Sequence, residues 1–357
     1  MSLDLLRSGV SADTLLLADP APHPLLLAGA NGEPTGAFVD PEVLYDDTYT
    51  GDQADIRTVD VYVPEGQGPF PLVIWTHGGG YVDRNPDKGY NVGQLMQAEG
   101  YVCGLIGYRL IEDEGSSAVP AGGQPTAFTA MAEMMLALAF LIANAETYRI
   151  DPARIVIMGH SSGGGMATRA AILAYWLGTI GVDRSAVKLC VPIDQDTGWN
   201  YERVVSRSRP ATTGTTLDRF GVLRDDQPEP GYAPVGYTEN SSIYPTGTAL
   251  YDHPTVLYSD IEGRRHPQNL SVIEEIGPET PRHFVPYGTT RGRSAATAEF
   301  VAAMQAQGRP VRSEFYSLNH AQIKRFIGDR STPEGARLTD DLLDEIADAT
   351  RPVIKQV

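Results

Sequence analysis

The segment 154–172 carries a serine in a pattern typical of nucleophilic catalysis. GHSSG at 159–163, centred on Ser161, is a G-x-S-x-G sequence that follows an apolar run and precedes a stretch rich in small residues. A serine on a tight turn between a strand and a helix projects its hydroxyl from the edge of a sheet, and flanking glycines permit the cramped backbone. The N-terminus of the next helix favours negative charge on a substrate. The pattern predicts Ser161 as a nucleophile, and the alternative is an ordinary tight turn.

Three consecutive glycines form the second chemical motif. Gly78, Gly79 and Gly80 follow an apolar run that leads into His77. Backbone N–H groups without side chains around them can converge on one acceptor, which is the geometry of an oxyanion hole. A flexible glycine loop and a phosphate cradle are the alternatives. The phosphate interpretation lacks the G-x-x-x-x-G-K-[ST] spacing.

The elements that must position these motifs alternate along the chain. Two runs, 43–49 and 57–63, predict an opening antiparallel pair of strands. Later apolar runs are continuous, as strands buried on both faces of a parallel sheet require, and lie at 72–76, 102–108, 155–158, 187–193, 283–287 and 312–318. Helices are expected at 91–99, 126–148, 164–178 and 294–307. This alternation predicts an α/β fold in which a mostly parallel twisted sheet carries helices on both faces.

The length of 357 residues suits one large domain. We expect a single domain over 1–357, with an N-terminal extension at 1–40. The segment 196–281 is dense in Pro, Gly, Thr, Tyr and Asp and has no strong period. We therefore expect it to be an inserted cap or lid.

The charge balance excludes several classes of protein. With 45 acidic and 28 basic side chains the net charge is −17, which argues against binding to nucleic acid.

The longest apolar stretch, 134–143, is about half of the roughly 20 residues that a membrane span needs. The first 27 residues have neither a basic start nor an unbroken apolar stretch, so we expect a cytoplasmic protein. The two cysteines and the scattered histidines show no metal-ligand spacing, so no metal or organic cofactor is expected.

Several motifs together resemble the α/β-hydrolases, in particular the HGGG-containing esterases and lipases related to hormone-sensitive lipase, bacterial carboxylesterases and kynurenine formamidases. The matching pieces are DVYVPEG (60–66), HGGGY (77–81), YRL (108–110), DPARI (151–155) and GHSSGG (159–164). The resemblance implies that Ser161 is the nucleophile and that the loop of Gly78, Gly79 and Gly80, with the N–H of Ser162, forms the oxyanion hole. It also implies that His320, which follows the last strand, is the general base.

The acid that should orient this histidine departs from the family pattern. The family places it after the penultimate strand, but no Asp or Glu occurs between Pro281 and Ala298. Asp194 directly follows the run 187–193 and is our candidate, with Asp196 as the alternative. Both could instead be solvated turn residues. Weaker candidates are Asp252, Asp260 and Glu299.

These residues predict a serine hydrolase that cleaves small-molecule carboxylic esters through an acyl-enzyme. One alternative is an amide, formamide or carbamate hydrolase built on the same groups. A second alternative is a ligand-binding or non-hydrolytic homologue with a degenerate acid position, because the fold alone does not determine function. The sequence leaves the size of the substrate open, and monomers and homo-oligomers are both compatible with it.

Overall fold

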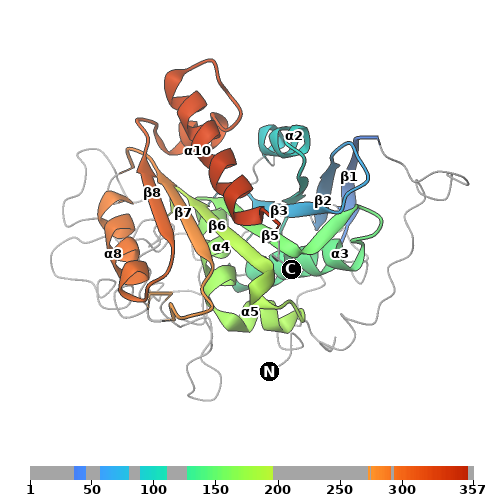
Figure 1. Ribbon diagram of the computed structural model, residues 1–357, viewed down its shortest axis with the longest axis horizontal. Coiled ribbons are helices and arrows are strands. Elements are labelled where there is room, and N and C mark those ends of the chain that lie inside the picture. The colour runs from blue at the N-terminus through green and yellow to red at the C-terminus, as the bar shows by residue number, and fades with distance from the viewer. Residues whose placement is uncertain are drawn as a thin grey trace, which may run out of the picture.

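Figure 1 shows the computed structural model, which describes residues 36–45, 57–79, 89–110, 127–195, 272–273, 275–290 and 293–352. Eight strands form one sheet in the order β1-β2-β4-β3-β5-β6-β7-β8. Their bounds are β1 Phe38–Leu44, β2 Thr58–Val63, β3 Phe70–Thr76, β4 Val102–Ile106, β5 Ile150–His160, β6 Val187–Ile193, β7 Arg282–Tyr287 and β8 Val311–Phe315. The β1–β2 and β2–β4 pairs are antiparallel and the other pairs are parallel. The expected mostly parallel sheet is confirmed.

Helices cover both faces of this sheet, as Figure 1 shows. The helices are α2 Tyr90–Ala98, α3 Ala127–Ala143, α4 Ser162–Ile172, α5 Ala174–Thr179, α8 Arg293–Ala306, α9 His320–Arg325 and α10 Pro333–Thr350. Apolar side chains of α3, α4, α5 and α8 share one core cluster with the sheet, and those of α2, α9 and α10 share the other. The core therefore consists of two layers, one on each side of the sheet.

The central strands supply side chains to both layers. In β3, Leu72 and Ile74 belong to the cluster beneath α3 and α4, whereas Val73 and Trp75 belong to the cluster beneath α2 and α10. All four are buried. Because successive side chains of a strand point to opposite faces, a strand covered on both faces must be apolar at every position. This explains the continuous apolar runs in the sequence.

The structure differs from the sequence expectations at several ends of elements. β1 spans Phe38–Leu44 instead of 43–49, and its pairing is interrupted by an irregularity between Asp40 and Val43. Since β1 is an edge strand with exposed residues, its pattern carries little of the apolar signal seen in the buried strands. The expected helix 164–178 is divided, because Leu173 adopts an extended conformation between α4 and α5.

The helix expected over 126–148 ends earlier, at Ala143. The short helix α9 and the long helix α10 add to the elements expected from sequence. The expected extension at 1–40 and the expected cap at 196–281 lie almost wholly outside the described residues.

The register of the strands brings their carboxyl ends to one edge of the sheet. Thr76 of β3 lies beside Gly159 of β5, and His160 of β5 lies beside Ile193 of β6. Side chains that directly follow these strands therefore meet at this edge, which is where open α/β sheets bind their ligands.

Candidate active site

Ser161 lies at a sharp turn between β5 and α4. Its backbone has φ 55° and ψ −120°, an unusual conformation for a residue with a side chain, and its N–H donates to the carbonyl of Ile193 at 3.0 Å. A Cβ at Gly159 would lie 2.3 Å from the carbonyl oxygen of Gly163, and one at Gly163 would lie 2.1 Å from that of Thr76. Both positions therefore require glycine, and the close packing that they allow holds the serine at the edge of the sheet.

His320 is the first residue of α9, and a capping box determines where this helix begins. The side chain of Asn319 accepts hydrogen bonds from the N–H groups of Ala321 and Gln322, and the Gln322 side chain accepts one from the N–H of Asn319. The ring places Nε2 2.9 Å from Oγ of Ser161. This helix start therefore directs the imidazole at the serine hydroxyl.

Asp194 directly follows β6 and its side chain has no exposed surface. Its Oδ2 accepts hydrogen bonds from Nδ1 of His320 and, at 2.6 Å, from Oγ1 of Thr290, while Oδ1 accepts one from the N–H of Gly288 at 2.9 Å. Burial alone would raise the pKa of this carboxyl. The bonds from His320 and Thr290, together with the charge of Arg293, nevertheless hold the pKa below its ordinary value. The carboxylate is therefore ionised at neutral pH.

The turn that supplies these donors packs closely on the histidine loop. A Cβ at Gly288 would lie 2.2 Å from the carbonyl oxygen of Leu318, and the N–H of Thr289 donates to that same oxygen at 2.8 Å. The end of β7 and the segment before His320 are thereby held together. This contact brings residues about 30 positions apart in the sequence to one carboxylate.

His160 lies directly beside this group of residues. Its Nε2–H donates to the backbone carbonyl of His320 at 2.8 Å, and the two rings lie 4.5 Å apart. Burial, and then the neighbouring charge of His320, lower the pKa of His160 well below its ordinary value. Because a carbonyl oxygen only accepts, Nε2 carries a proton, and the lowered pKa keeps the ring neutral at neutral pH. The His160 ring thus supports the first turn of α9.

The glycine loop after β3 lies against the serine. A Cβ at Gly78 would lie 2.9 Å from Cβ of Ser161. The hydroxyl of Tyr108 donates to the carbonyl of His77 at 3.0 Å, and the two rings stack with their centroids 4.4 Å apart. Tyr108 therefore holds the peptide that leads into the loop. Within the loop, Gly79 has φ 124°, a backbone conformation that favours glycine.

Most residues predicted from the sequence meet at this site. Ser161, His320 and Asp194 form one chain of hydrogen bonds, with Gly78, Gly79 and the buried first residue of α4, Ser162, beside it. The predicted residues Gly80, Asp196, Asp252 and Asp260 lie outside the described residues, and Glu299 is exposed on α8.

The sequence analysis assigned no role to Thr290, Gly288 or His160. Thr290 lies in the turn where the family resemblance leads one to expect the acid, and that departure was the only signal in the sequence. The contact between Thr290 and Asp194 joins the ends of two strands, β6 and β7, so it follows from the tertiary structure alone.

Part of this chain is similar in sequence to known proteins. Residues 59–178 match the sequence profile of the BD-FAE family. A segment of 134 residues is 26% identical to gut esterase 1 of Caenorhabditis elegans. The matched segment covers 36% of this chain and 22% of that protein. The matched segment thus spans about a fifth of the curated relative.

Solved structures share the fold over most of their length. Esterase B from Lactobacillus rhamnosis, in an inhibited form, has a TM-score of 0.57 at 15% identity and covers 88% of each chain. The chain therefore has the α/β-hydrolase fold. Esterase 2 of Thermogutta terrifontis, phosphonylated by sarin, gives a TM-score of 0.56 at 16% identity, and the match covers 90% of this chain and 98% of the esterase chain. A truncated carbohydrate esterase from gut microbiota gives a TM-score of 0.58 at 13% identity. This match covers 91% of this chain and 100% of the esterase chain.

Within the described residues, side chains of types that can bind a metal ion cluster at the same place. His160, Asp194 and His320 offer ligand atoms that all lie within 4.8 Å of one another. In the hydrogen bonds described above, Nε2 of His160 faces a carbonyl, Nδ1 of His320 faces the carboxylate and Nε2 of His320 faces the serine hydroxyl. The donor set therefore fits a proton relay.

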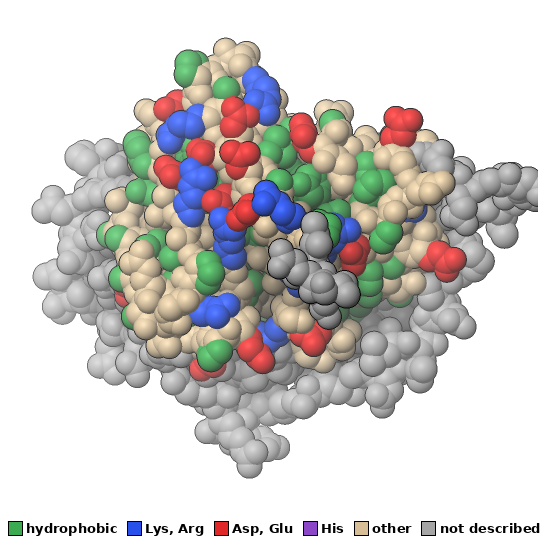
Figure 2. All heavy atoms as spheres, viewed as in Figure 1, with side chains coloured by type: hydrophobic (Ala, Val, Ile, Leu, Met, Phe, Trp, Pro, Cys, Tyr) green, Lys and Arg blue, Asp and Glu red, His purple; other side chains and the backbone are tan. Residues whose placement is uncertain are grey.

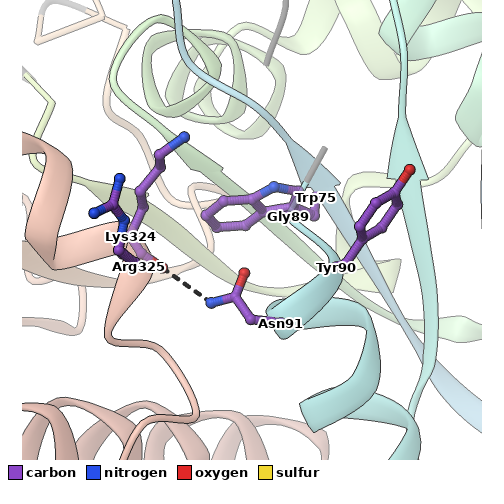
Figure 3. Close-up of a pocket in the computed structure, with 6 residues that line it drawn as sticks. All are labelled: Trp75, Gly89, Tyr90, Asn91, Lys324 and Arg325. Carbon is purple, nitrogen blue, oxygen red and sulfur yellow. Dashed lines mark hydrogen bonds between the residues drawn. The ribbon is translucent and has the colours of Figure 1, made fainter. Parts of the chain in front are cut away.

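A cavity of about 230 Å³ lies beside α9, on the side of Trp75 and the start of α2. Figure 3 shows the six residues that line it, which are Trp75, Gly89, Tyr90, Asn91, Lys324 and Arg325. Ser161, His320 and Asp194 are not among them. The side chain of Asn91 donates to the carbonyls of Lys324 and Ile327 at 3.1 and 2.8 Å, so it ties α2 to the end of α9.

Acidic and basic side chains are interleaved over α10 and β8, as Figure 2 shows. Arg312 of β8 forms ion pairs with Asp341 and Glu345 of α10, and Arg282 of β7 pairs with Asp348. These pairs join the helix to the edge of the sheet. Within the described residues, no helix combines the length and apolar character that crossing a bilayer requires.

Proposed function

We propose that this α/β-hydrolase cleaves small-molecule carboxylic esters through an acyl-enzyme formed on Ser161. The observation that carries the proposal is the unbroken chain of hydrogen bonds from the buried Asp194 through His320 to the serine hydroxyl. This arrangement of nucleophile, base and orienting acid is recognised by its geometry rather than by the order of its residues.

The reaction follows from the donors and acceptors in this chain. Nδ1–H of His320 donates to Asp194, so Nε2 carries the lone pair and accepts the proton of Ser161 Oγ as that oxygen attacks the ester carbonyl. The imidazolium then returns this proton to the leaving alcohol. A water molecule takes the place of the alcohol and releases the acid by the same transfers in reverse.

Negative charge on the carbonyl oxygen requires donors beside Ser161. The backbone N–H groups of Gly79 and Ser162 are the proposed donors, since Gly79 follows Gly78, which packs against Ser161, and Ser162 is at the N-terminus of α4. The contact between Tyr108 and His77 holds the loop that carries Gly79. In comparable sites, one such donor stabilises the transition state by about 3 to 4 kcal/mol.

The position of Asp194 bears on both alternative functions. A degenerate acid position was the main argument for a non-hydrolytic homologue, and the contact between Asp194 and His320 removes that argument. The same contact removes the reason to expect poor amide cleavage. The preference for esters over amides therefore rests on the similarity to proteins named esterases.

The proposal is tested by the hydrolysis of p-nitrophenyl acetate and butyrate and of p-nitroacetanilide. We expect turnover of both esters, at least tenfold slower turnover of the anilide, and loss of at least about 10⁴-fold in kcat for Ser161→Ala. Ser185→Ala, an exposed serine outside the site, is the matched control and should keep wild-type rates. Equal ester hydrolysis by wild type and Ser161→Ala would exclude the proposal.

A further inference from the structure

The turn after β7 provides two of the three hydrogen bonds that Asp194 receives. The N–H of Gly288 donates to Oδ1 at 2.9 Å, and the hydroxyl of Thr290 donates to Oδ2 at 2.6 Å. The third bond comes from His320 and ends on the same Oδ2. Each carboxylate oxygen is therefore bound by a donor of this turn.

Two donors on different oxygens constrain a carboxylate more than one does. The bond from Gly288 alone leaves the group free to rotate about the bond to its carbon, because a hydrogen bond to one oxygen sets a distance and not a plane. His320 also donates to Oδ2, but the bond from Thr290 sets the plane of the group from the same turn as Gly288, without relying on the imidazole that the carboxylate orients. Asp194 has no exposed side-chain surface, so a lost donor there is not readily replaced by bulk water.

Threonine suits this task in two ways. Its hydroxyl has one proton to donate, and a bond to an ionised carboxylate is stronger than one between neutral groups. Its branched Cβ also restricts the rotation that would carry the hydroxyl away. The backbone supports this placement, since the carbonyl of Thr290 accepts from the N–H of Arg293 at the start of α8.

We infer that Thr290 is a positioning residue, whose hydroxyl fixes the plane of the Asp194 carboxylate so that Oδ2 faces Nδ1 of His320. The inference rests on the proposed function, because it concerns the same relay. Thr290 acts through Asp194 and contacts neither Ser161 nor His320 in the described hydrogen bonds. It therefore affects the proton transfer and leaves substrate binding unchanged.

The kinetic test compares variants within this one turn. Thr290→Val removes the donor and retains the shape, and we expect kcat to fall by about 10- to 100-fold with KM within about twofold of wild type. Thr290→Ser restores the donor and should recover activity to within about threefold of wild type. Thr289→Val is the matched control, because that hydroxyl donates at 3.3 Å to the carbonyl of Leu318 and not to the acid. It should stay within about threefold of wild type.

A double-mutant cycle separates positioning from general damage to the turn. In the Asp194→Asn background there is no carboxylate to orient, so Thr290→Val should change kcat by less than about twofold. A purely structural role would reduce activity equally in both backgrounds. The inference is overturned by an equal loss in both, by Thr290→Val within threefold of wild type, or by failure of Thr290→Ser to recover activity.

A readout without turnover keeps this test separate from the esterase proposal. The Nδ1 proton of His320 gives a proton NMR resonance that His320→Gln identifies by its disappearance. Thr290→Val should broaden or shift this resonance, whereas Thr289→Val should not. If wild type cleaves no ester, the proposed function fails and the resonance still decides the role of Thr290, since an unchanged signal in Thr290→Val contradicts it.

Discussion

Replacing Asp194 with asparagine isolates the contribution of the acid. The two side chains have nearly the same shape, and asparagine tolerates the left-handed backbone that Asp194 adopts at φ 47°. The variant should therefore fold as the wild type does. What changes is one atom of the side chain, because an NH₂ group replaces an oxygen that accepts.

The position of Gly288 decides which way the new amide points. Its N–H needs an acceptor at Oδ1, so the amide nitrogen takes the place of Oδ2 and faces Nδ1 of His320. The opposite orientation sets the NH₂ against the N–H of Gly288 and costs about 1 to 3 kcal/mol. An amide nitrogen only donates, so Nδ1 must accept and the imidazole proton moves to Nε2.

With its proton on Nε2, His320 cannot accept the proton of Ser161. A change of tautomer of this kind in a serine relay lowers kcat by about 10⁴-fold. At 1.36 kcal/mol for each factor of ten, this corresponds to about 5.4 kcal/mol of lost transition-state stabilisation. KM should change little, because Asp194 is buried behind the histidine.

The assay is steady-state hydrolysis of p-nitrophenyl butyrate, with urea denaturation to verify the fold. Asp196→Asn is the matched control, since it is the other acid that the sequence offers at this point and the relay is complete without it. Its kcat should equal that of wild type. An Asp194→Asn enzyme that keeps more than a tenth of the wild-type kcat would refute the assignment, as would a large loss in Asp196→Asn.

Two further predictions concern stability. Burial lowers the pKa of His283 from its ordinary value of 6.5 to about 4. Between pH 6.5 and pH 4 the unfolded chain therefore binds a proton that the folded chain does not, so the stability of the fold decreases as the pH drops through this range. Between pH 7.5 and 5.0 this loss is about 2 kcal/mol, and His283→Gln should remove it from the pH dependence measured by urea denaturation; an unchanged pH dependence would contradict this. Asn91→Ala removes the two donors to the end of α9 shown in part in Figure 3 and should cost about 1 to 3 kcal/mol in unfolding free energy. Asn91→Asp keeps the size but not the donors and should be no more stable, and a cost below about 0.3 kcal/mol in both variants would show that these bonds do not hold α9.

The buried strands could be predicted because strands that are buried on both faces consist mainly of apolar residues. β3, β5 and β6 lie between two layers of helices, so their buried positions are largely apolar and form runs that are visible in the sequence. The break at Leu173 was not predictable in this way. No glycine or proline marks it, and Ile172 before it and Trp176 after it are both buried. Tertiary packing decides where α4 ends and α5 begins.

The sequence by itself determined where the proposed nucleophile lies. Ser161 could be predicted because a strained turn between a strand and a helix needs glycines at fixed positions, so its constraint is local and appears as a motif. His320 was predicted from its place after the last strand, with the help of the family resemblance. Both residues depend on the order of elements along the chain, which the sequence contains.

Only the tertiary structure decided between acids and joined them to their donors. The sequence favoured Asp194, which directly follows a strand, and left Asp196 as the alternative, because the choice depends on which carboxylate reaches Nδ1 of His320, 126 residues from Asp194. The hydroxyl of Thr290, 96 residues from Asp194, completes that contact. A hydrogen bond depends on distances of a few tenths of an ångström, and these are set by the packing of β6 against β7, which has no local signature in the chain.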